Sequence, residues 1–174
     1  RWVMREVHKN LFCGNQWDAA CVIRRNGEPL DGWAVVHAAK EPFHREFVGY
    51  KTPGAPKDHP EYLYAERGNR LALNMVDAPT ANYFSRELFD KALEYIDNKL
   101  KEGYKVLVHC NQGESRAPSV CLLYMVKHGV LKGLTWVDCL QDFLVVYPYY
   151  KPGEGILKFL HANFDYYKPE ELVE

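Results

Sequence analysis

The two residues most able to do chemistry together in this sequence are Cys110 and Arg116, with five residues between them. They lie between a Val-rich segment, 105–109, and an apolar segment that begins near Pro118. A tight loop that opens a helix turns consecutive backbone N–H groups inward, and such loops bind anions. The helix N-terminus and the guanidinium would also stabilise a thiolate, so we expect the pKa of Cys110 to lie well below its free value of ~8.5.

This loop has the parts needed to transfer a phosphoryl group to sulfur. The guanidinium of Arg116 is planar and can bind two phosphate oxygens at once. A Cys110 thiolate held under that phosphoryl group is positioned for in-line attack on phosphorus. Gly113 would let the loop backbone approach the oxygens closely. The residues expected to bind phosphate are Asn111, Gln112, Gly113, Glu114, Ser115 and Arg116.

The same stretch resembles the Cys-x5-Arg signature of the cysteine-based protein tyrosine phosphatases, and its His-Cys-x-x-Gly-x-Ser-Arg form resembles their dual-specificity branch. The match includes His109, Gly113, Ser115 and Pro118, after a strand-like segment and before a helix-like one. The resemblance implies that Cys110 is the nucleophile and that His109 orients the loop and supports the thiolate. It also implies that Ser115 forms a hydrogen bond within the loop.

A second catalytic group is needed, because expelling an oxygen leaving group requires a general acid. In the family this acid is an Asp some thirty residues before the cysteine, at the end of the preceding strand. Asp77 lies 33 residues before Cys110 and follows the apolar segment 71–76. An ordinary turn Asp near a proline is the other interpretation of Asp77. Asp58 and Asp90 are the next candidates for the acid.

The loop departs from the family pattern in two places. Position 117 usually carries Ser or Thr, whose hydroxyl helps the thiolate leave the phosphocysteine, but here it is Ala117. Either the intermediate breaks down more slowly or another donor compensates; Ser119 is nearby but would face along the helix. Glu114 puts a negative charge near the pocket mouth, where polyphosphoinositide-directed relatives carry lysines. A lipid substrate is therefore disfavoured.

Three functions remain open at this point. The first is a cysteine-dependent phosphatase that hydrolyses phosphotyrosine, phosphoserine or phosphothreonine of proteins through a phosphocysteine intermediate. The second is a phosphate-binding pseudophosphatase, or a slow phosphatase acting on a non-protein phosphate ester; Ala117 keeps it open. The third is a sulfurtransferase, which also presents a loop cysteine before a helix but has no use for Asp77.

The remaining pattern predicts the elements that position the loop. Four short apolar segments have strand character: 11–14, 33–37, 71–76 and 105–109. Helical spacing predicts helices over 84–100, from Pro118 to a stop at Gly129, from Thr135 to before Pro148, and over 155–164. The strand–helix–strand order predicts that 71–76 and 105–109 form a parallel pair. The resemblance, which covers about 11–164, implies an α/β fold with a twisted, mostly parallel central sheet and helices on both sides.

Two regions have both an ordinary structural interpretation and a functional one. The segment 40–70 is rich in Pro and Gly and predicts a long loop, either a surface insertion or a substrate-recognition loop. Five tyrosines near the C-terminus favour a cover for the core edge around the last helix over a nucleic-acid surface: Tyr147, Tyr149, Tyr150, Tyr166 and Tyr167.

Length and composition limit the number of domains, the kinds of partner and the state of the cysteines. The length of 174 residues predicts one domain, 1–174, and a net charge of −1 argues against broad nucleic-acid or membrane binding. Five cysteines without paired spacing indicate reduced thiols, and those other than Cys110 are expected to be buried. No metal-ligand spacing is visible and the thiolate route needs no metal, so we expect no cofactor. We expect a monomeric cytoplasmic protein whose partner is a phosphorylated protein or peptide.

Overall fold

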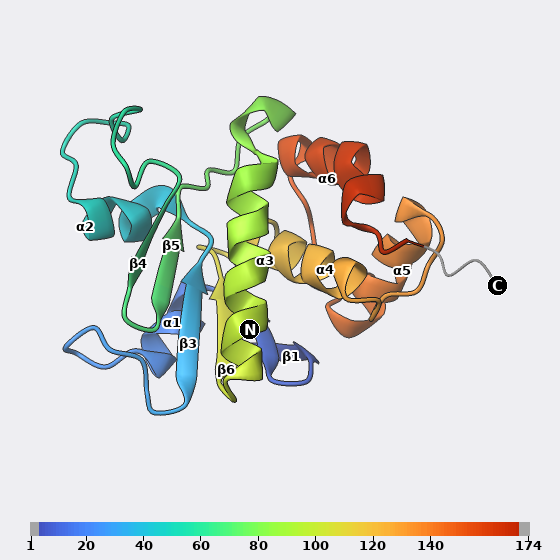
Figure 1. Ribbon diagram of the computed structural model, residues 1–174, viewed down its shortest axis with the longest axis horizontal. Helices are drawn as coiled ribbons and strands as arrows, with labels where there is room; N and C mark the ends of the chain where they lie inside the picture. Colours follow the sequence, from blue (N-terminus) through green and yellow to red (C-terminus); the bar gives the residue numbers. More distant parts are fainter. Residues whose placement is uncertain (1–3, 171–174) are drawn as a thin grey trace.

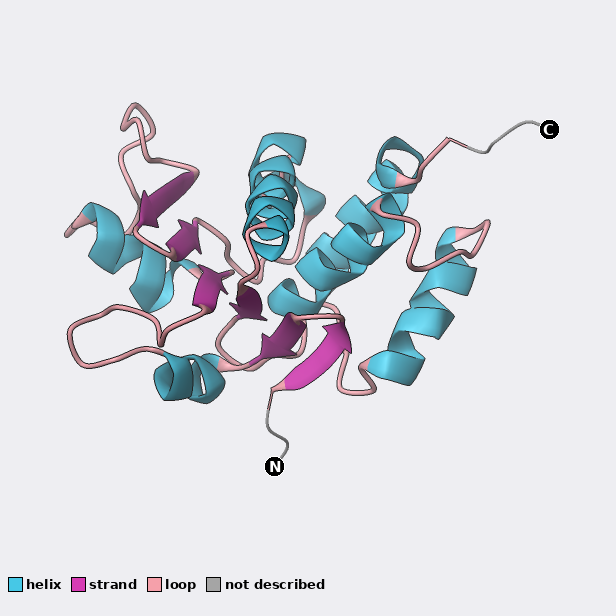
Figure 2. Ribbon diagram, turned by 60° about the horizontal axis from the view of Figure 1, so that its bottom comes forward, coloured by secondary structure: helices cyan, strands magenta, loops and turns pink. Residues whose placement is uncertain are grey.

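The computed structural model describes residues 4–170, which form a six-stranded sheet between helices (Figures 1 and 2). The strands lie in the order β1-β2-β6-β3-β5-β4. The four inner strands are parallel to one another, whereas β1 and β4 at the edges pair antiparallel with β2 and β5. The strands are β1 Arg5–His8, β2 Leu11–Gly14, β3 Trp33–His37, β4 Tyr64–Arg67, β5 Arg70–Leu73 and β6 Lys105–His109. The expected α/β fold with a mostly parallel sheet is confirmed.

Strand β6 is the central strand that leads to the candidate loop, and it is buried on both faces. Successive side chains of a strand point to opposite faces. Val106 and Val108 accordingly belong to the larger core cluster, whereas Leu107 packs with Ala19 and Val22 on the other side. This two-sided burial explains why the segment reads as a continuous apolar run.

Helices cover both faces of the sheet (Figure 2). They are α1 Gln16–Val22, α2 Arg45–Val48, α3 Arg86–Lys101, α4 Arg116–Lys127, α5 Trp136–Val146 and α6 Glu154–Tyr167. Side chains cap three of them: Asn15 accepts from Asp18 N, Ser85 from Leu88 N, and Thr135 from Asp138 N. The cap at Ser85 explains why α3 begins two residues after the predicted Phe84.

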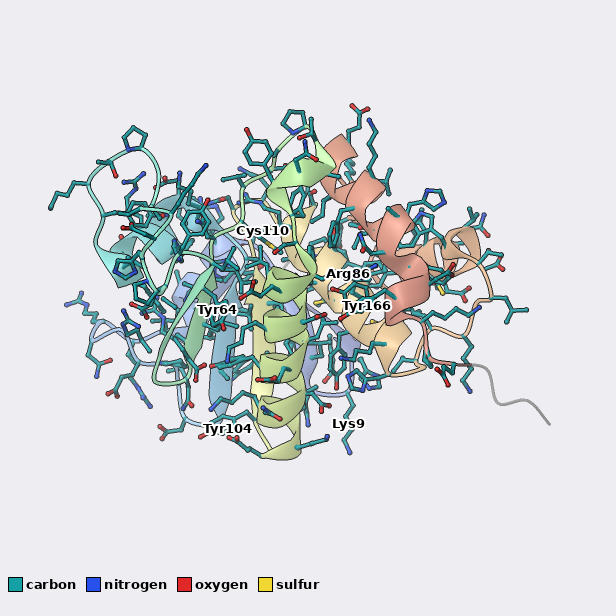
Figure 3. All side chains as sticks on the ribbon, turned by 45° about the horizontal axis from the view of Figure 1, so that its top comes forward. Lys9, Tyr64, Arg86, Tyr104, Cys110 and Tyr166 are labelled. Carbon is teal, nitrogen blue, oxygen red and sulfur yellow. The ribbon has the colours of Figure 1, made fainter. Side chains whose placement is uncertain are left out.

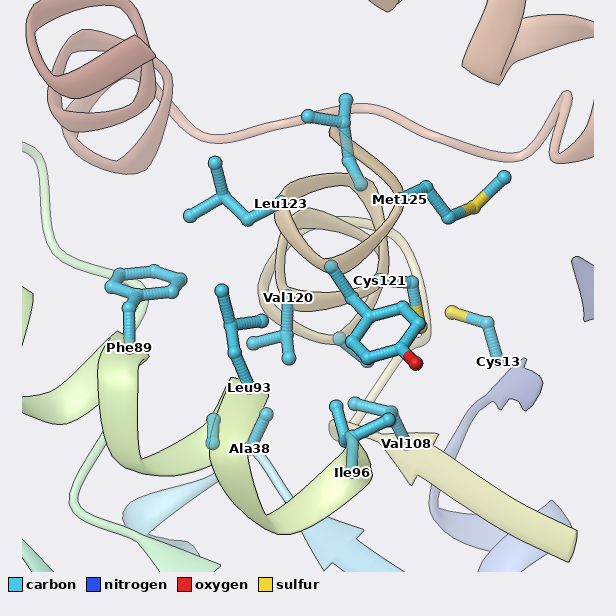
Figure 4. Close-up of a cluster of buried hydrophobic side chains, with 14 of the residues drawn as sticks. Cys13, Ala38, Phe89, Leu93, Ile96, Val108, Val120, Cys121, Leu123 and Met125 are labelled. Carbon is cyan, nitrogen blue, oxygen red and sulfur yellow. The ribbon is translucent and has the colours of Figure 1, made fainter. Parts of the chain in front are cut away.

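Helix α4 is the buried centre of the larger layer, as its nearly continuous apolar sequence predicts. All its residues from Ala117 to Val126 are buried. Figure 4 shows Val120, Cys121 and Leu123 of α4 surrounded by side chains from α3 and the sheet. The N-terminus of α4 is therefore held firmly where the chain leaves β6.

Several sequence predictions need correction. Strands β5 and β6 do not pair with each other, because β3 lies between them, although all three are parallel. Strand β5 ends at Leu73 rather than at residue 76. The sequence patterns also missed β1 and α1. Cys21, on the outer face of α1, is exposed rather than buried.

The segment 40–70 is more ordered than the predicted loop. It contains a short helical stretch, Lys40–His44, followed by α2 and later by β4. Arg45 connects the residues on either side of α2. It pairs with the carboxylate of Glu41 at 2.6 Å and donates to the carbonyl of Thr52 at 2.7 Å. Within residues 4–170 no helix combines the length and apolar character needed to cross a membrane.

Candidate active site

The loop from Cys110 to Arg116 connects the central strand to the central helix. It lies at the carboxyl end of parallel strands, the edge at which open α/β sheets bind ligands. Cys110 follows β6 directly (Figure 3) and its side chain is 2% exposed. The backbone N–H of Cys110 donates to the carbonyl of Gly14 at the end of β2, at 3.4 Å. The start of the loop is therefore fixed to the neighbouring strand.

Gly113 is required by the loop backbone itself. Its φ is 76°, in the left-handed region that favours glycine. A Cβ at this position would lie 2.9 Å from the carbonyl oxygen of Gly14. The sequence prediction attributed this glycine to close approach of phosphate. In the structure the close approach is to the end of β2.

Loop N–H groups surround the thiol. Those of Gly113 and Ala117 lower the pKa of the Cys110 thiol, in opposition to the effect of burial. The backbone N–H groups of Gln112, Glu114 and Ser115 find no acceptor anywhere in residues 4–170. Successive unpaired N–H groups in a loop that opens a helix are the features of an anion-binding nest.

Arg116 is held by hydrogen bonds at two of its three nitrogens. Nη1 donates to the carbonyl of Met75 at 3.0 Å, and Nη2 donates to Oδ1 of Asn111 at 2.7 Å. The Asn111 amide is in turn anchored, because its Nδ2 donates to Gln16 Oε1 at 3.1 Å and to the Glu41 carbonyl at 3.0 Å. Nε of Arg116 is buried and has no partner among the described residues. The guanidinium is thus held in one orientation, and its Nε–H donor has no acceptor among the described residues.

The thiol is less acidic in this structure than the sequence predicted. Burial raises the pKa of Cys110 above its ordinary value, while Arg116 and the N–H groups of Ala117 and Gly113 act in the opposite direction. The expectation of a pKa well below that value is therefore wrong for this structure. The physical reason is the nearly complete removal of the sulfur from water, which favours the neutral thiol.

Asp77 reaches the same cavity from a different part of the chain. The cavity has a volume of about 180 Å³ and is lined by Asp77, Cys110, Gln112, Glu114, Ser115, Arg116 and Lys151. Asp77 is exposed, and its Oδ1 lies 3.4 Å from the hydroxyl of Ser115. Neither Asp58 nor Asp90 lines this cavity; Asp90 instead accepts from the hydroxyl of Tyr166 at 2.8 Å.

The other predicted residues lie as follows. His109 is completely buried and its Nδ1 lies 3.1 Å from the carbonyl of Cys110. Ser115 does not bond within the loop as expected; its Oγ accepts from the N–H of Gly153 at 2.8 Å. Ala117 is fully buried. Ser119 donates to the carbonyl of Ser115 at 2.6 Å and its Oγ lies 2.7 Å from the Tyr150 hydroxyl, so this hydroxyl already has two partners.

Sequence reasoning missed the segment 147–153, which lies against the loop. The Tyr147 hydroxyl donates to the carbonyl of Gly113 at 2.5 Å. The backbone N–H of Lys151 donates to the carbonyl of Glu114 at 2.7 Å. Tyr147 and Tyr150 are buried as predicted, but their hydroxyls also have bonding roles near the loop. Tyr166, by contrast, is half exposed. The sequence feature that could have indicated this segment is a run of aromatic residues that ends at Pro152 and Gly153.

No group of three or more His, Cys, Asp or Glu side chains is arranged to hold a metal ion in the part of the chain that the structure describes. The arrangement is therefore one of a cysteine, an arginine and a carboxylate around an N–H-lined loop. Such a site can attack an anionic ester and protonate its leaving group.

Part of the chain is similar in sequence to known proteins. A family model described as "Dual specificity phosphatase, catalytic domain" matches residues 55–141, half of the chain. Dual specificity protein phosphatase 5 of Rattus norvegicus is 45% identical over 51 residues, 29% of this chain and 13% of that protein. A probable rhodanese domain-containing dual specificity protein phosphatase of Dictyostelium discoideum is 30% identical over 104 residues, 57% of this chain and 21% of that protein.

The fold is also found among solved structures. The crystal structure of human tyrosine phosphatase-like serine/threonine/tyrosine-interacting protein superposes with a TM-score of 0.62 and 20% identity, covering 96% of this chain and 99% of that one. The matched segments span less than a quarter of the two curated relatives. The matched half of the sequence contains Asp77, Cys110 and Arg116, and the chain belongs to the dual specificity phosphatase family.

Proposed function

We propose that this protein hydrolyses phosphomonoesters of proteins through a phosphocysteine intermediate. One observation carries the proposal: a cysteine and an arginine of one loop and a carboxylate from a distant part of the sequence line one cavity of about 180 Å³. The unpaired loop N–H groups and the free Nε of Arg116 supply donors for the oxygens of a bound phosphate.

In the first step Cys110, having lost its thiol proton to solvent, attacks phosphorus as the thiolate, and the ester oxygen leaves. The loop N–H groups and Arg116 hold the phosphate oxygens and stabilise the charge that builds up on them in the transition state. Asp77, as the carboxylic acid, gives its proton to the leaving oxygen, so that an alcohol or phenol departs. The products of this step are phosphorylated Cys110 and the Asp77 carboxylate.

In the second step water breaks the phosphorus–sulfur bond. The Asp77 carboxylate takes a proton from the attacking water, and the thiolate of Cys110 is the leaving group. Hydrogen bonds from Gly113 N–H and Ala117 N–H stabilise that thiolate as it departs. Inorganic phosphate is released and both catalytic groups return to their starting forms.

Phosphorylated proteins or peptides are the substrate class that family membership supports. Phosphotyrosine and phosphoserine or phosphothreonine share the phosphomonoester group that the loop would bind. The exposed Asp77 and the exposed Lys151 lie at the cavity, where residues flanking a phosphorylated side chain could contact them. A small non-protein phosphate ester is the alternative substrate.

Ala117 favours a second candidate, a pseudophosphatase or slow phosphatase that binds phosphate but turns over poorly. The family hydroxyl at this position is absent, and the Ser119 hydroxyl is engaged with the carbonyl of Ser115. A sulfurtransferase is disfavoured, because it would have no use for Asp77 at the same cavity as Cys110.

The test is hydrolysis of an aryl phosphate and a panel of phosphopeptides by wild type, Cys110→Ser and Cys21→Ser. We expect Cys110→Ser to lose nearly all turnover and still bind phosphate or its oxyanion mimics, because a serine hydroxyl ionises far too weakly to attack. Cys21→Ser, which changes an exposed thiol outside the cavity, should behave as wild type. Substantial turnover by Cys110→Ser would overturn the mechanism. Phosphate binding without wild-type turnover would favour the pseudophosphatase, and a positive thiosulfate assay the sulfurtransferase.

A further inference from the structure

A continuous series of hydrogen bonds connects a half-buried arginine to the backbone of the candidate nucleophile. Nε of Arg70 donates to Nε2 of His37 at 3.0 Å. Nδ1 of His37 lies 2.5 Å from Nε2 of His109, and Nδ1 of His109 lies 3.1 Å from the carbonyl oxygen of Cys110. Both imidazoles are completely buried. The series crosses three adjacent strands of the sheet, β5, β3 and β6.

The two ends of this series decide where its protons are. A guanidinium nitrogen can only donate, so Nε2 of His37 must accept and the His37 proton must be on Nδ1. That proton is donated to Nε2 of His109, whose own proton is then on Nδ1. Nδ1–H of His109 donates to the Cys110 carbonyl, which can only accept. With neutral rings, this is the one assignment that gives every bond a donor and an acceptor.

Packing holds the groups in these orientations. The ring of Phe43 stacks on His37 at 4.6 Å between centroids and meets His109 edge-on at 4.7 Å. The guanidinium of Arg70 lies 4.7 Å from the centroid of the Phe47 ring. Burial lowers the pKa of His37 well below its ordinary value and that of His109 to about 4, so both rings are neutral at pH 7.

We propose that Arg70 is a positioning residue that, together with the Cys110 carbonyl at the other end, holds the tautomers of His37 and His109 and thereby helps to fix the backbone of Cys110. With Arg70 present, moving both protons to Nε2 would spoil two contacts, the one between Arg70 and His37 and the one between His109 and the Cys110 carbonyl. Without a donor at Arg70, only the contact with the carbonyl opposes the move. The unprotonated Nδ1 of His109 would then face the Cys110 carbonyl, and two acceptors repel. The role of this series in catalysis rests on the proposed phosphatase function. The assignment of the tautomers rests only on the hydrogen bonds and does not depend on that function.

Two substitutions at position 70 separate the donor from its charge. Gln carries its side-chain nitrogen at the same number of bonds from Cα as the Nε of arginine, so Arg70→Gln keeps a neutral donor. Arg70→Met has a methyl group at that position and keeps no donor. Nitrogen-15 NMR of the histidine rings distinguishes Nδ1–H from Nε2–H tautomers directly and needs no enzyme activity.

We expect wild type and Arg70→Gln to show Nδ1–H at both His37 and His109, and Arg70→Met to show Nε2–H at both rings in a measurable fraction of the molecules. On an aryl phosphate, kcat should fall roughly tenfold in Arg70→Met and remain near wild type in Arg70→Gln. KM should change little in either variant, because neither alters the phosphate-binding groups. Unchanged tautomers in Arg70→Met would overturn the proposal, as would an equal loss of kcat in both variants.

A second background separates the tautomer role from any other effect of Arg70→Met. In His37→Asn the amide nitrogen occupies the position of Nδ1 and donates to His109 without help from Arg70. Adding Arg70→Met to His37→Asn should therefore cost no further kcat and leave His109 with its proton on Nδ1. A further loss in the double variant at a temperature where both are folded would contradict the tautomer role. If wild type itself had no phosphatase activity, the NMR result would still decide the tautomer assignment.

Discussion

Gly153 lies directly against Asp77: a Cβ built on the glycine would be 2.6 Å from the carboxylate oxygen Oδ1. The N–H of Gly153 also donates to Ser115 Oγ, whose hydroxyl is 3.4 Å from the same carboxylate. The segment 147–153 therefore borders the proposed acid as well as the loop. The orientation of Asp77 depends on a residue 76 positions later in the sequence.

Gly153→Ala should displace the Asp77 carboxylate, because a methyl group cannot remain 2.6 Å from an oxygen. We expect kcat on alkyl phosphates to fall about tenfold or more, and kcat on aryl phosphates with good leaving groups to change little. Gly54→Ala is the matched control, since nothing lies within 4 Å of a Cβ at Gly54. Equal losses on both substrates would show that the glycine does not act through the acid.

Asp77→Asn tests the acid itself. Only a poor leaving oxygen needs its proton early, so the variant should lose more rate on alkyl than on aryl phosphates and should flatten the basic limb of the pH–rate profile. Asp58→Asn and Asp90→Asn should behave as wild type, because neither residue lines the cavity. An unchanged basic limb in Asp77→Asn would assign the acid to another residue.

Ala117→Ser tests whether the missing family hydroxyl limits turnover. A charge-assisted hydrogen bond to the departing thiolate is worth about 1.5–3 kcal/mol, or roughly ten- to a hundredfold in rate. Wild type should therefore release a burst of leaving group before slow turnover, and acid quench should trap phosphorylated Cys110. Ala117→Ser should shrink the burst and raise the steady-state rate. Ala162→Ser, at an exposed position on α6, is the control. A wild type without a burst would contradict the prediction.

Arg116→Met should raise the pKa of Cys110 further, because Arg116 is the largest of the groups that lower it. The measurement is the rate of alkylation by iodoacetate as a function of pH, in a Cys21→Ser background that removes an exposed competing thiol. The midpoint of the profile should move to higher pH in the arginine variant. A midpoint that stays in place would mean that the guanidinium does not act on the thiol.

Acid should destabilise the fold through the two buried histidines. The pKa of His109 is about 4 in the folded chain and ~6.5 when unfolded, so the unfolded chain binds more protons between these values. The free energy of unfolding should thus fall as the pH is lowered from about 7 to about 5, by ~2 kcal/mol for His109 alone. Urea denaturation at each pH measures this. His109→Asn keeps a donor toward Cys110 without a titrating ring, and its pH dependence should be shallower; an identical dependence would contradict the assignment.

The loop and its flanking elements could be predicted because their signals are local. Cys110 and Arg116 have only five residues between them, the Val-rich strand precedes them directly, and α4 is apolar on nearly every side. Strand β1 could not be predicted in this way, since Arg5–His8 is mostly polar and is ordered by pairing with β2. Its existence depends on a neighbour rather than on its own composition.

The relationships between distant segments were beyond the sequence. His37 and Arg70 meet because β3 and β5 pair in one particular register, and no pattern in either strand specifies a partner. Tyr147 was expected only to cover the core, because a hydroxyl bonded to one specific carbonyl leaves no compositional signal. The low thiol pKa was predicted wrongly for a similar reason, since burial of Cys110 is set by the packed fold.

The loop is fastened from both ends of the chain, by Gln16 and Glu41 on one side and by Tyr147, Lys151 and Gly153 on the other. Contacts between residues so far apart in sequence form late, because the chain loses conformational entropy in closing a long loop before the contact contributes any favourable free energy. During synthesis, β6 and α4 emerge before the segment 147–153 exists. The loop can therefore reach its final shape only after that segment has left the ribosome, so the molecule would acquire its chemistry as one of the last events of its folding.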